Sequence, residues 1–443
     1  MRLDGSVKTA WSLILLCSSA LSLPGCSGGG GDAAQAPAPP PPCSATLVPG
    51  TPTTVTLSPN ESCLTSLPVI GASAFMFIAD GDSGKGPVIS NVTGPSGQVL
   101  ITPDPSDLDP IGKTLTAFPF NSVNTFLFPQ TPLNGITPLR GSDVEHTFHA
   151  QSSLNDLTGG SGNYAVSIVN QNAQTQTIRI HSIVNPRSNP TGGTVRVNFI
   201  LCGHPNFTIA DINNPNVRSP FRDAVARFQA LSANAGLIVQ DMDIRLFECD
   251  PPTKARFRFI YTEAEIAALH KLSARIQNNG LNFVFVEQIL GDGGGTILGQ
   301  SAGIPGPAIQ GTGASGVLVA TLGDPAFWNA SEWTIAGNTM AHEGGHFLGL
   351  FHPTERCGAD PTTACPESGL RTLPAWFHVD PIPDTPACPS SRDTNRDGIL
   401  SPEECGVDFG GTNVMFWQAD PSLDQNVWTQ GQRFVLHRNP FVQ

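Results

Sequence analysis

The chain has 443 residues and a net charge of −13, with only 13% charged residues, 46 glycines and 40 prolines. A sparsely charged, acidic chain offers no basic stripe for phosphate groups, so nucleic acid is not an expected partner. The length implies at least two hydrophobic cores, and the turn-rich composition favours an extracellular protein with much β structure.

Residues 1–26 have the pattern of an export signal. A short basic start precedes an apolar run over residues 11–23, and the sequence Leu-Pro-Gly-Cys ends at Cys26. This ending resembles a bacterial lipobox, in which the cysteine is lipidated, so we expect an exported lipoprotein on the outer surface or facing the periplasm. The apolar run is too short for an ordinary membrane span, which leaves the lipid anchor as the expected membrane contact. A freely secreted protein is the alternative.

Residues 27–43 are rich in Gly and Pro and have the composition of a flexible linker. Residues 44–190 are predicted to form an all-β, sandwich-like domain, because short β-forming runs alternate with turn residues and no helical period is present. The expected strands are 53–57, 74–78, 88–92, 99–102, 163–169 and 175–183. The sequence leaves open whether this domain is an accessory binding module or an inhibitory pro-domain.

The cysteines also favour export. With Cys17 and Cys26 set aside, an even number remains, as disulfide pairing requires. The candidates are Cys43, Cys63, Cys202, Cys249, Cys357, Cys365, Cys388 and Cys405. Proximity predicts the pairs Cys43–Cys63 and Cys202–Cys249, and the pairing of the last four stays open. No CxxC pair is present, so a cytosolic metal site is not expected.

Residues 194–443 are predicted to be a second domain, in which alternating strands and helices indicate a mixed sheet backed by helices. The expected strands are 195–201, 237–247, 281–289 and 316–322, and the expected helices are 222–231 and 263–277. A further helix, capped by Ser331, is expected to run into residue 342 and beyond. After residue 352 the chain is irregular and rich in Pro and Cys.

Residues 342–352 have the sequence HEGGHFLGLFH, which matches the extended zinc-peptidase signature HExxHxxGxxH. Residues four apart on a helix project from one face, so His342 and His346 can present their imidazoles to one ion. Gly349 can take a positive φ and end the helix, which returns His352 as a third ligand. Glu343 leans over the same side without sharing the metal and suits a general base.

Three protein ligands leave one coordination position open, which distinguishes a catalytic zinc from a closed structural site. The alternative is an amphipathic helix that carries two histidines at this spacing by chance. Because the glycine and the third histidine also fall where the signature requires them, the metal site is favoured.

Residues 393–404 match the twelve-residue calcium loop, with a glycine at position 6. The expected ligands are Asp393, Asn395, Asp397, the carbonyl of Ile399, Ser401 through water, and Glu404. Flanking prolines argue against paired helices, so we expect an isolated loop with a structural Ca²⁺ ion. An acidic surface turn is the alternative.

The signature and the segments after it resemble the metzincin clan of zinc peptidases and, within it, the pappalysin family. The run Asn413-Val414-Met415 is similar to the Met-turn of that family, and segments 384–388 and 429–433 also resemble it. The likeness covers residues 194–443. It implies a zinc endopeptidase for protein or peptide substrates, in which Met415 forms an apolar floor beneath the imidazoles. It also implies a metzincin-like domain in which the edge strand of the sheet pairs with extended substrate.

One position departs from the family pattern. Many relatives have a tyrosine two residues after the methionine that reaches toward the metal or the developing oxyanion, whereas this chain has Trp417. An indole offers only an N–H donor. We therefore expect either a weak oxyanion contact from Trp417 or another donor in its place.

The expected mechanism has zinc polarising the scissile carbonyl, while Glu343 takes a proton from water and passes it to the leaving amine. Asp384 is a candidate acceptor for an imidazole N–H. Asp420 and Asp424 follow the Met-turn, where they would favour Arg or Lys after the cut. The alternative function is a zinc-containing surface binding or adhesion protein with a vestigial peptidase site. Trp417 favours this alternative, and Glu343 opposes it, since metal retention does not need that carboxylate.

Overall fold

The computed structural model describes residues 43–81, 87–95, 97, 99–101, 123–128, 162–187, 190–204, 207–214, 219–240, 246–276, 278–290, 296–354, 380, 382 and 384–443. The expected signal segment with Cys26, the linker up to residue 42, and both Cys357 and Cys365 lie outside the described residues. Within the described ranges, no helix has the length and apolar composition needed to cross a bilayer.

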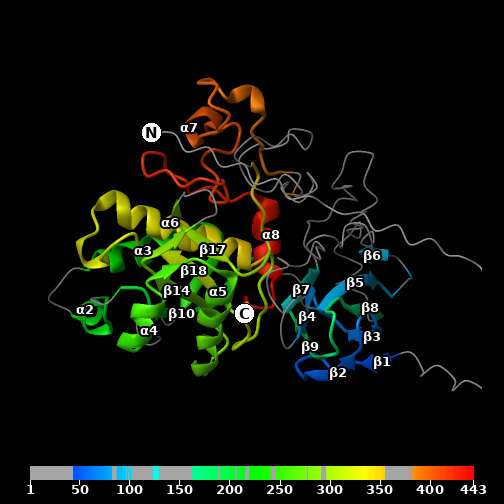
Figure 1. The fold of residues 1–443 in the computed structure, drawn as a ribbon. Helices are drawn as coiled ribbons and strands as arrows, with labels where there is room; N and C mark the ends of the chain where they lie inside the picture. Colours follow the sequence, from blue (N-terminus) through cyan, green and yellow to red (C-terminus); the bar gives the residue numbers. More distant parts are fainter. Residues whose placement is uncertain are drawn as a thin grey trace, which may run out of the picture. The chain divides into compact units, whose positions relative to one another are not determined.

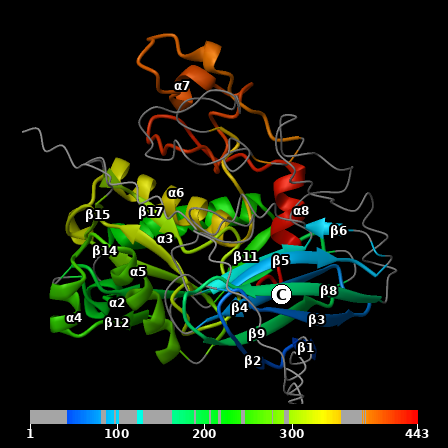
Figure 2. The same ribbon diagram turned by 45° about the vertical axis from the view of Figure 1, so that its right-hand side comes forward.

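Two sheets form the N-terminal part of the described chain (Figure 2). Their strand orders are β1–β3–β8–β5–β6 and β2–β9–β4–β7. The bounds are β1 (Cys43–Thr46), β2 (Thr53–Leu57), β3 (Ser62–Val69), β4 (Ala74–Asp80), β5 (Pro87–Thr93), β6 (Val99–Ile101), β7 (Val123–Phe128), β8 (Gly162–Asn170) and β9 (Gln176–Asn185). Both sheets contribute to one apolar core, which includes Leu57, Leu67, Phe77 and Ile168. The six predicted strands are present, and β1, β3 and β7 are additional.

Strand β4 is buried on both faces. Phe75, Phe77 and Ala79 belong to the core between the two sheets. Met76 and Ile78 belong instead to the apolar core of the following domain, because successive side chains of a strand point to opposite faces. The N-terminal domain therefore supplies part of a second core.

A mixed six-stranded sheet forms the centre of the second domain (Figure 1). Its main path is β11–β10–β14–β18–β17, and β12 also pairs with β10. All of these pairs are parallel except β17 with β18, which is antiparallel. The bounds are β10 (Gly193–Leu201), β11 (Leu237–Gln240), β12 (Leu246–Glu248), β14 (Leu281–Val286), β17 (Gly299–Ser301) and β18 (Val317–Ala320).

Helices cover both faces of this sheet. Odd-numbered residues of β10 and β14, such as Phe199 and Phe283, pack in a core with α3 and α6. Even-numbered residues, such as Ile200 and Val284, pack in a core with α5. The helices of this domain before residue 350 are α2 (Ile209–Asn213), α3 (Pro220–Asn234), α4 (Pro251–Arg256), α5 (Glu263–His270) and α6 (Ala330–Phe347), with the 3₁₀ turn η3 (Pro325–Phe327) before α6.

Three expected elements are divided in the structure. Residues 237–247 form β11 and β12, and residues 241–245 between them lie outside the described ranges. Residues 281–289 divide because β15 (Gln288–Leu290) leaves the main sheet and pairs with β13 (Phe259–Ile260) and β16 (Thr296–Ile297). The expected helix 263–277 is α5 followed by the 3₁₀ turn η2 (Lys271–Arg275).

The C-terminal segment is mostly irregular, as its Pro and Cys content predicts. It contains η5 (Ser390–Arg392), α7 (Pro402–Cys405) and α8 (Gln430–Arg438). The end of the chain returns to the sheet beside β10. The Gln443 N–H donates to the Thr194 carbonyl at 2.9 Å, and the Thr194 N–H donates to the Gln443 carbonyl at 2.6 Å. Arg187, between the two domains, donates to the carbonyls of His437 and Val442. The interdomain segment is therefore attached to the C-terminal helix.

Both predicted disulfides are confirmed, Cys43–Cys63 and Cys202–Cys249. A third bond, Cys388–Cys405, joins two of the cysteines whose pairing the sequence leaves open. Three disulfides are compatible with an exported protein, because such bonds persist in oxidising compartments.

We expect Ile78→Ala to destabilise both domains. Ile78 lies on strand β4 of the sandwich, but its side chain packs in the core of the second domain. Truncation of a buried Ile costs about 2–5 kcal/mol of unfolding free energy. Hydrogen exchange should rise in peptides from β10 and β14 as well as from β4.

Ile70→Ala is the matched control, because Ile70 is 75% exposed and such a change costs less than about 0.5 kcal/mol. Faster exchange in the sandwich alone would contradict the shared core.

Candidate metal centre

Helix α6 carries the first two histidines and begins with a capping box. The side-chain oxygen of Asn329 accepts from the N–H groups of Ser331 and Glu332 at 2.9 and 3.1 Å. Glu332 Oε2 accepts in turn from the Asn329 N–H at 2.7 Å. The predicted cap at Ser331 is wrong by two positions, because the helix is capped by Asn329. At the spacing of Asn329 and Glu332, each side chain can accept from the main-chain N–H of the other residue.

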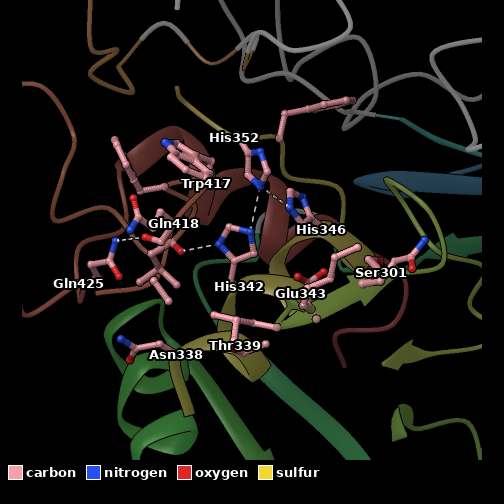
Figure 3. A pocket seen from close by; sticks show the side chains of 18 of the residues that line it. Ser301, Asn338, Thr339, His342, Glu343, His346, His352, Trp417, Gln418 and Gln425 are labelled. Carbon is pink, nitrogen blue, oxygen red and sulfur yellow. Dashed lines mark hydrogen bonds between the residues drawn. The ribbon is translucent and has the colours of Figure 1, made fainter. Parts of the chain in front are cut away.

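Three imidazoles, two from the last turns of this helix and one from the chain after it, converge on one point (Figure 3). Nε2 of His352 lies 2.9 Å from Nε2 of His342 and 2.9 Å from Nε2 of His346. The opposite ring nitrogens face carbonyl oxygens, with His342 Nδ1 at 2.9 Å from Val414 O and His346 Nδ1 at 2.7 Å from Leu350 O. A carbonyl oxygen only accepts, so Nδ1 of these two rings carries the proton and Nε2 keeps its lone pair.

This donor set fits a metal ion. All three ligand atoms lie within 4.8 Å of one another, and tetrahedral zinc with Zn–N bonds of about 2.05 Å would separate them by roughly 3.3 Å. Burial, and then His352, lowers the pKa of His342 to about 3 and holds the pKa of His346 well below its usual value. Both rings are therefore neutral at pH 7, as metal binding requires.

Gly349 has a φ of +110°, which confirms the predicted helix end. Its N–H donates to the His346 carbonyl at 2.9 Å, and the Leu350 N–H donates to the Gly345 carbonyl at 3.0 Å. This turn places the Leu350 carbonyl against His346 and directs the chain toward His352. A side chain at residue 349 would strain the backbone.

Glu343 lies buried beside the edge strand, with 8% of its surface exposed. A Cβ on Gly299 of β17 would lie 2.5 Å from Glu343 Cγ, so this approach requires glycine. Burial raises the pKa of Glu343 to about 7, against the opposing effects of His352 and of the Ser301 main-chain N–H. A carboxyl group with such a pKa can accept and release a proton near neutral pH.

The sequence gives no signal for the roles of Gly299 and Ser301. Both belong to a strand of three residues, and their position beside Glu343 depends on the antiparallel pairing of β17 with β18. Short strands without alternation carry little local pattern, so only the tertiary structure brings these residues to the site.

Met415 is fully buried and packs against α6. A Cβ on Gly345 would lie 2.4 Å from the Met415 sulfur, which explains a glycine immediately before His346. The Met415 N–H donates to Asn413 Oδ1 at 2.8 Å. Asn413 in turn exchanges two side-chain hydrogen bonds with Gln432 of α8. The turn that carries Met415 is therefore fixed by the C-terminal helix.

Two candidate side chains, Asp384 and Trp417, have other hydrogen-bond partners in this structure. Asp384 accepts from the Gly431 N–H at 3.2 and 2.9 Å, so it caps α8 and does not orient an imidazole. Trp417 Nε1 donates to the Leu400 carbonyl at 2.8 Å. Because an indole has a single N–H, Trp417 has no donor left for a developing oxyanion.

The three histidines open onto a cleft of about 480 Å³. Strand β17, helix α6 and the segment after Met415 supply its walls. In Figure 3, Glu343 lies on the side of Ser301 and His342 on the side of Gln418. In the described parts of 43–187, no residue lines the cleft. Cys43 and Cys63 are bonded to each other, so they offer no thiol to a metal.

Two carboxylates that the sequence places in the substrate pocket, those of Asp420 and Asp424, lie elsewhere in the structure. Neither Asp420 nor Asp424 lines the cleft. Asp424 pairs with Arg227 at 2.7 Å, and Asp420 accepts from the N–H and hydroxyl of Ser422 at 2.7 Å each. The predicted preference for Arg or Lys after the cut therefore loses its structural basis.

The expected calcium loop is tightly turned, with Gly398 at a φ of +78°. Asp393 Oδ2 accepts from the Gly398 N–H and Asn395 Oδ1 from the Asp397 N–H, both at 2.9 Å. Asp393 Oδ1 is buried without a hydrogen-bond partner. A buried carboxylate oxygen without a donor is costly, and a cation would satisfy it.

Glu404 fits a cation less well. Both of its oxygens accept main-chain N–H bonds, Oε1 from Thr394 at 2.8 Å and Oε2 from Ser401 at 3.1 Å. Burial opposes ionisation, but the hydrogen bonds from Ser401 and Thr394 outweigh it and lower the pKa of Glu404 to about 2. Asp393 thus has an unsatisfied carboxylate oxygen for a cation. Glu404 would have to give up main-chain hydrogen bonds before it could bind the same ion.

No family model matches the chain, and no curated protein matches it. Among solved structures, it has a weak likeness to a family two carbohydrate esterase from Cellvibrio japonicus. The sequence identity is 10% and the TM-score 0.13, over 54% of this chain and 74% of the other. A likeness of this size carries no argument about fold or function, so the functional argument rests on the residues of this chain.

We expect His352→Ala to abolish stoichiometric zinc binding, because it removes one of the three converging nitrogens. Loss of a group that merely orients a ligand weakens zinc binding about 10- to 100-fold, so loss of a ligand should exceed this range. Metal analysis after dialysis measures the effect.

His181→Ala, in strand β9, removes an imidazole remote from the site and should leave the zinc content unchanged. Equal zinc in wild type and His352→Ala would contradict the site.

Proposed function

We propose that this protein is a zinc-dependent endopeptidase, exported and either lipid-anchored at Cys26 or freely secreted. The observation that supports it best is the position of Glu343, a buried carboxyl group beside three converging imidazoles in an open cleft. Metal storage would not need this carboxyl group, whereas hydrolysis does. The resemblance of residues 194–443 to the metzincin clan and the pappalysin family belongs to the same proposal.

The edge strand offers a way to bind extended peptide. Among the described strands, β17 pairs only with β18, and residues 299–301 line the cleft. The other edge of β17 therefore has main-chain groups that an added peptide strand can use, apart from the Ser301 N–H, which bonds to Glu343. A peptide bound there would pass beside Glu343, since Gly299 and Glu343 are in close contact.

The catalytic roles follow from this arrangement. A zinc ion, when bound by the three imidazoles, would polarise the scissile carbonyl and lower the pKa of its water to about 7. Glu343 accepts the proton of the attacking water and passes it to the leaving amine. The carbonyls of Val414 and Leu350 hold two imidazoles in the tautomer that presents Nε2 to the site. No covalent enzyme intermediate is required.

A zinc-containing binding or adhesion protein is the second candidate. The observation that favours it is the Trp417 N–H, which is used by the Leu400 carbonyl and leaves this position without an oxyanion donor. This candidate predicts bound zinc without peptide hydrolysis.

We expect Glu343→Gln to retain zinc and to lose peptide hydrolysis. A positioned general base contributes about 10²–10⁴-fold to the rate, and glutamine keeps the shape of the side chain without its basicity. Cleavage of denatured casein, with zinc determined in both proteins, measures the effect.

Equal cleavage by both proteins would remove Glu343 from the mechanism. Zinc in both without cleavage in either would favour the binding protein.

We also propose a structural calcium ion at loop 393–404, bound through Asp393. The loop is linked to the cleft, because Leu400 bonds to Trp417 and packs with Phe416, and both Phe416 and Trp417 line the cleft. Calcium at this loop would stabilise a wall of the cleft without taking part in the reaction.

Calcium should therefore raise the unfolding temperature of the wild type, by an amount equivalent to about 2.7 kcal/mol at 100 times its Kd. Asp393→Ala should remove this response. Asp408→Ala changes an exposed carboxylate outside the loop and should keep it. A response to calcium that survives Asp393→Ala would place the ion elsewhere.

A further inference from the structure

Among the described residues that line the cleft, only the catalytic groups can carry charge. These groups are the three histidines and Glu343. The side of the edge strand carries the apolar residues Ile297, Leu298 and Ile304 and the uncharged polar residues Gln300 and Ser301. The side of the Met415 turn carries apolar groups and the neutral amides of Gln418 and Gln425, which lie together in Figure 3.

The amide of Gln425 is fully used by the main chain. Its Nε2 donates to the Gln418 carbonyl at 2.8 Å and to the Gly411 carbonyl at 3.4 Å, and its Oε1 accepts from the Asp420 N–H at 3.0 Å. Gln425 is only 3% exposed. Gln425 is therefore a rigidly held, uncharged part of this wall. Its amide N–H groups are already used, so it has no free donor for a charged substrate side chain.

The ion pair between Arg227 and Asp424 lies outside the cleft. Arg227 of α3 donates to Asn338 Oδ1 at 2.9 Å, to Asp424 at 2.7 Å and to the Gln425 carbonyl at 3.3 Å. A Cβ on Gly337 would lie 2.6 Å from Arg227 Cβ, so this glycine makes room for Arg227. Arg227 compensates the Asp424 charge, and neither residue lines the cleft.

We infer that the substrate is a peptide segment with uncharged residues on both sides of the scissile bond. This inference rests on the proposed function and specifies its substrate class. A charged side chain that enters such walls loses its water without gaining a counter-charge, which penalises it relative to an apolar or amide side chain. Discrimination should reach at least about tenfold in kcat/KM, the lower range for a mismatched pocket.

The test is a map of the cuts made in denatured casein by the zinc-loaded full chain, with new termini identified by mass spectrometry. Asp, Glu, Lys and Arg should each be depleted at least about tenfold at the two residues flanking each cut, relative to their frequency in casein. The variant Gln418→Glu adds a carboxylate to the wall with little change in shape. It should admit Lys and Arg with a gain of about tenfold.

Asp424→Asn is the matched control, because this carboxylate lies outside the cleft and pairs with Arg227. Its pattern of cuts should equal that of the wild type. Enrichment of Lys or Arg at the cuts of the wild type would overturn the inference while leaving the peptidase intact. The absence of any cut by zinc-loaded wild type would reject the proposed function, and this inference with it.

Discussion

The convergence of three imidazole nitrogens from two segments of the chain is the constraint on which the site depends. Nε2 of His352 lies 2.9 Å from Nε2 of both His342 and His346, and main-chain carbonyls fix the tautomers that point two of these lone pairs inward. Two neutral imidazoles with inward lone pairs, placed beside a third ring, form a donor set that suits a shared cation. The surrounding structure supplies the rigidity that holds the three rings in place.

That rigidity comes from segments far apart in sequence. The Val414 carbonyl that contacts His342 lies on a turn fixed by Asn413 and Gln432. The C-terminal helix is in turn attached to the sheet through Gln443 and to the interdomain segment through Arg187. Because β4 contributes to the core of both domains, the sandwich is part of the same support. The three imidazoles are thus supported by segments of both domains.

The sequence predicts the parts of this structure that depend on local pattern. The four-residue spacing of His342 and His346 and the positive φ of Gly349 follow from helix geometry and from the properties of glycine. Six strands of the sandwich and strands β10, β14 and β18 of the central sheet follow from alternation and burial. Strands β1, β3, β7 and β17 are not predicted, and β15 leaves the main sheet for reasons that are not local.

The parts that sequence reasoning places wrongly depend on tertiary partners. Asp384 faces the start of α8, and Trp417 faces Leu400, because these groups satisfy free main-chain N–H and C=O groups there. Asp424 is paired by Arg227, which lies 197 residues earlier in the chain. Spacing in the sequence indicates which side chains are near the Met415 turn, but it does not indicate which of them face the cleft.

The central claim is tested most directly by returning zinc to metal-free protein. Wild type stripped with a chelator should be inactive on denatured casein, and cleavage should rise linearly with added zinc and stop rising at one equivalent per chain. Full activity in the stripped protein, or one bound zinc per chain without recovery of cleavage, would contradict a peptidase built on these three histidines.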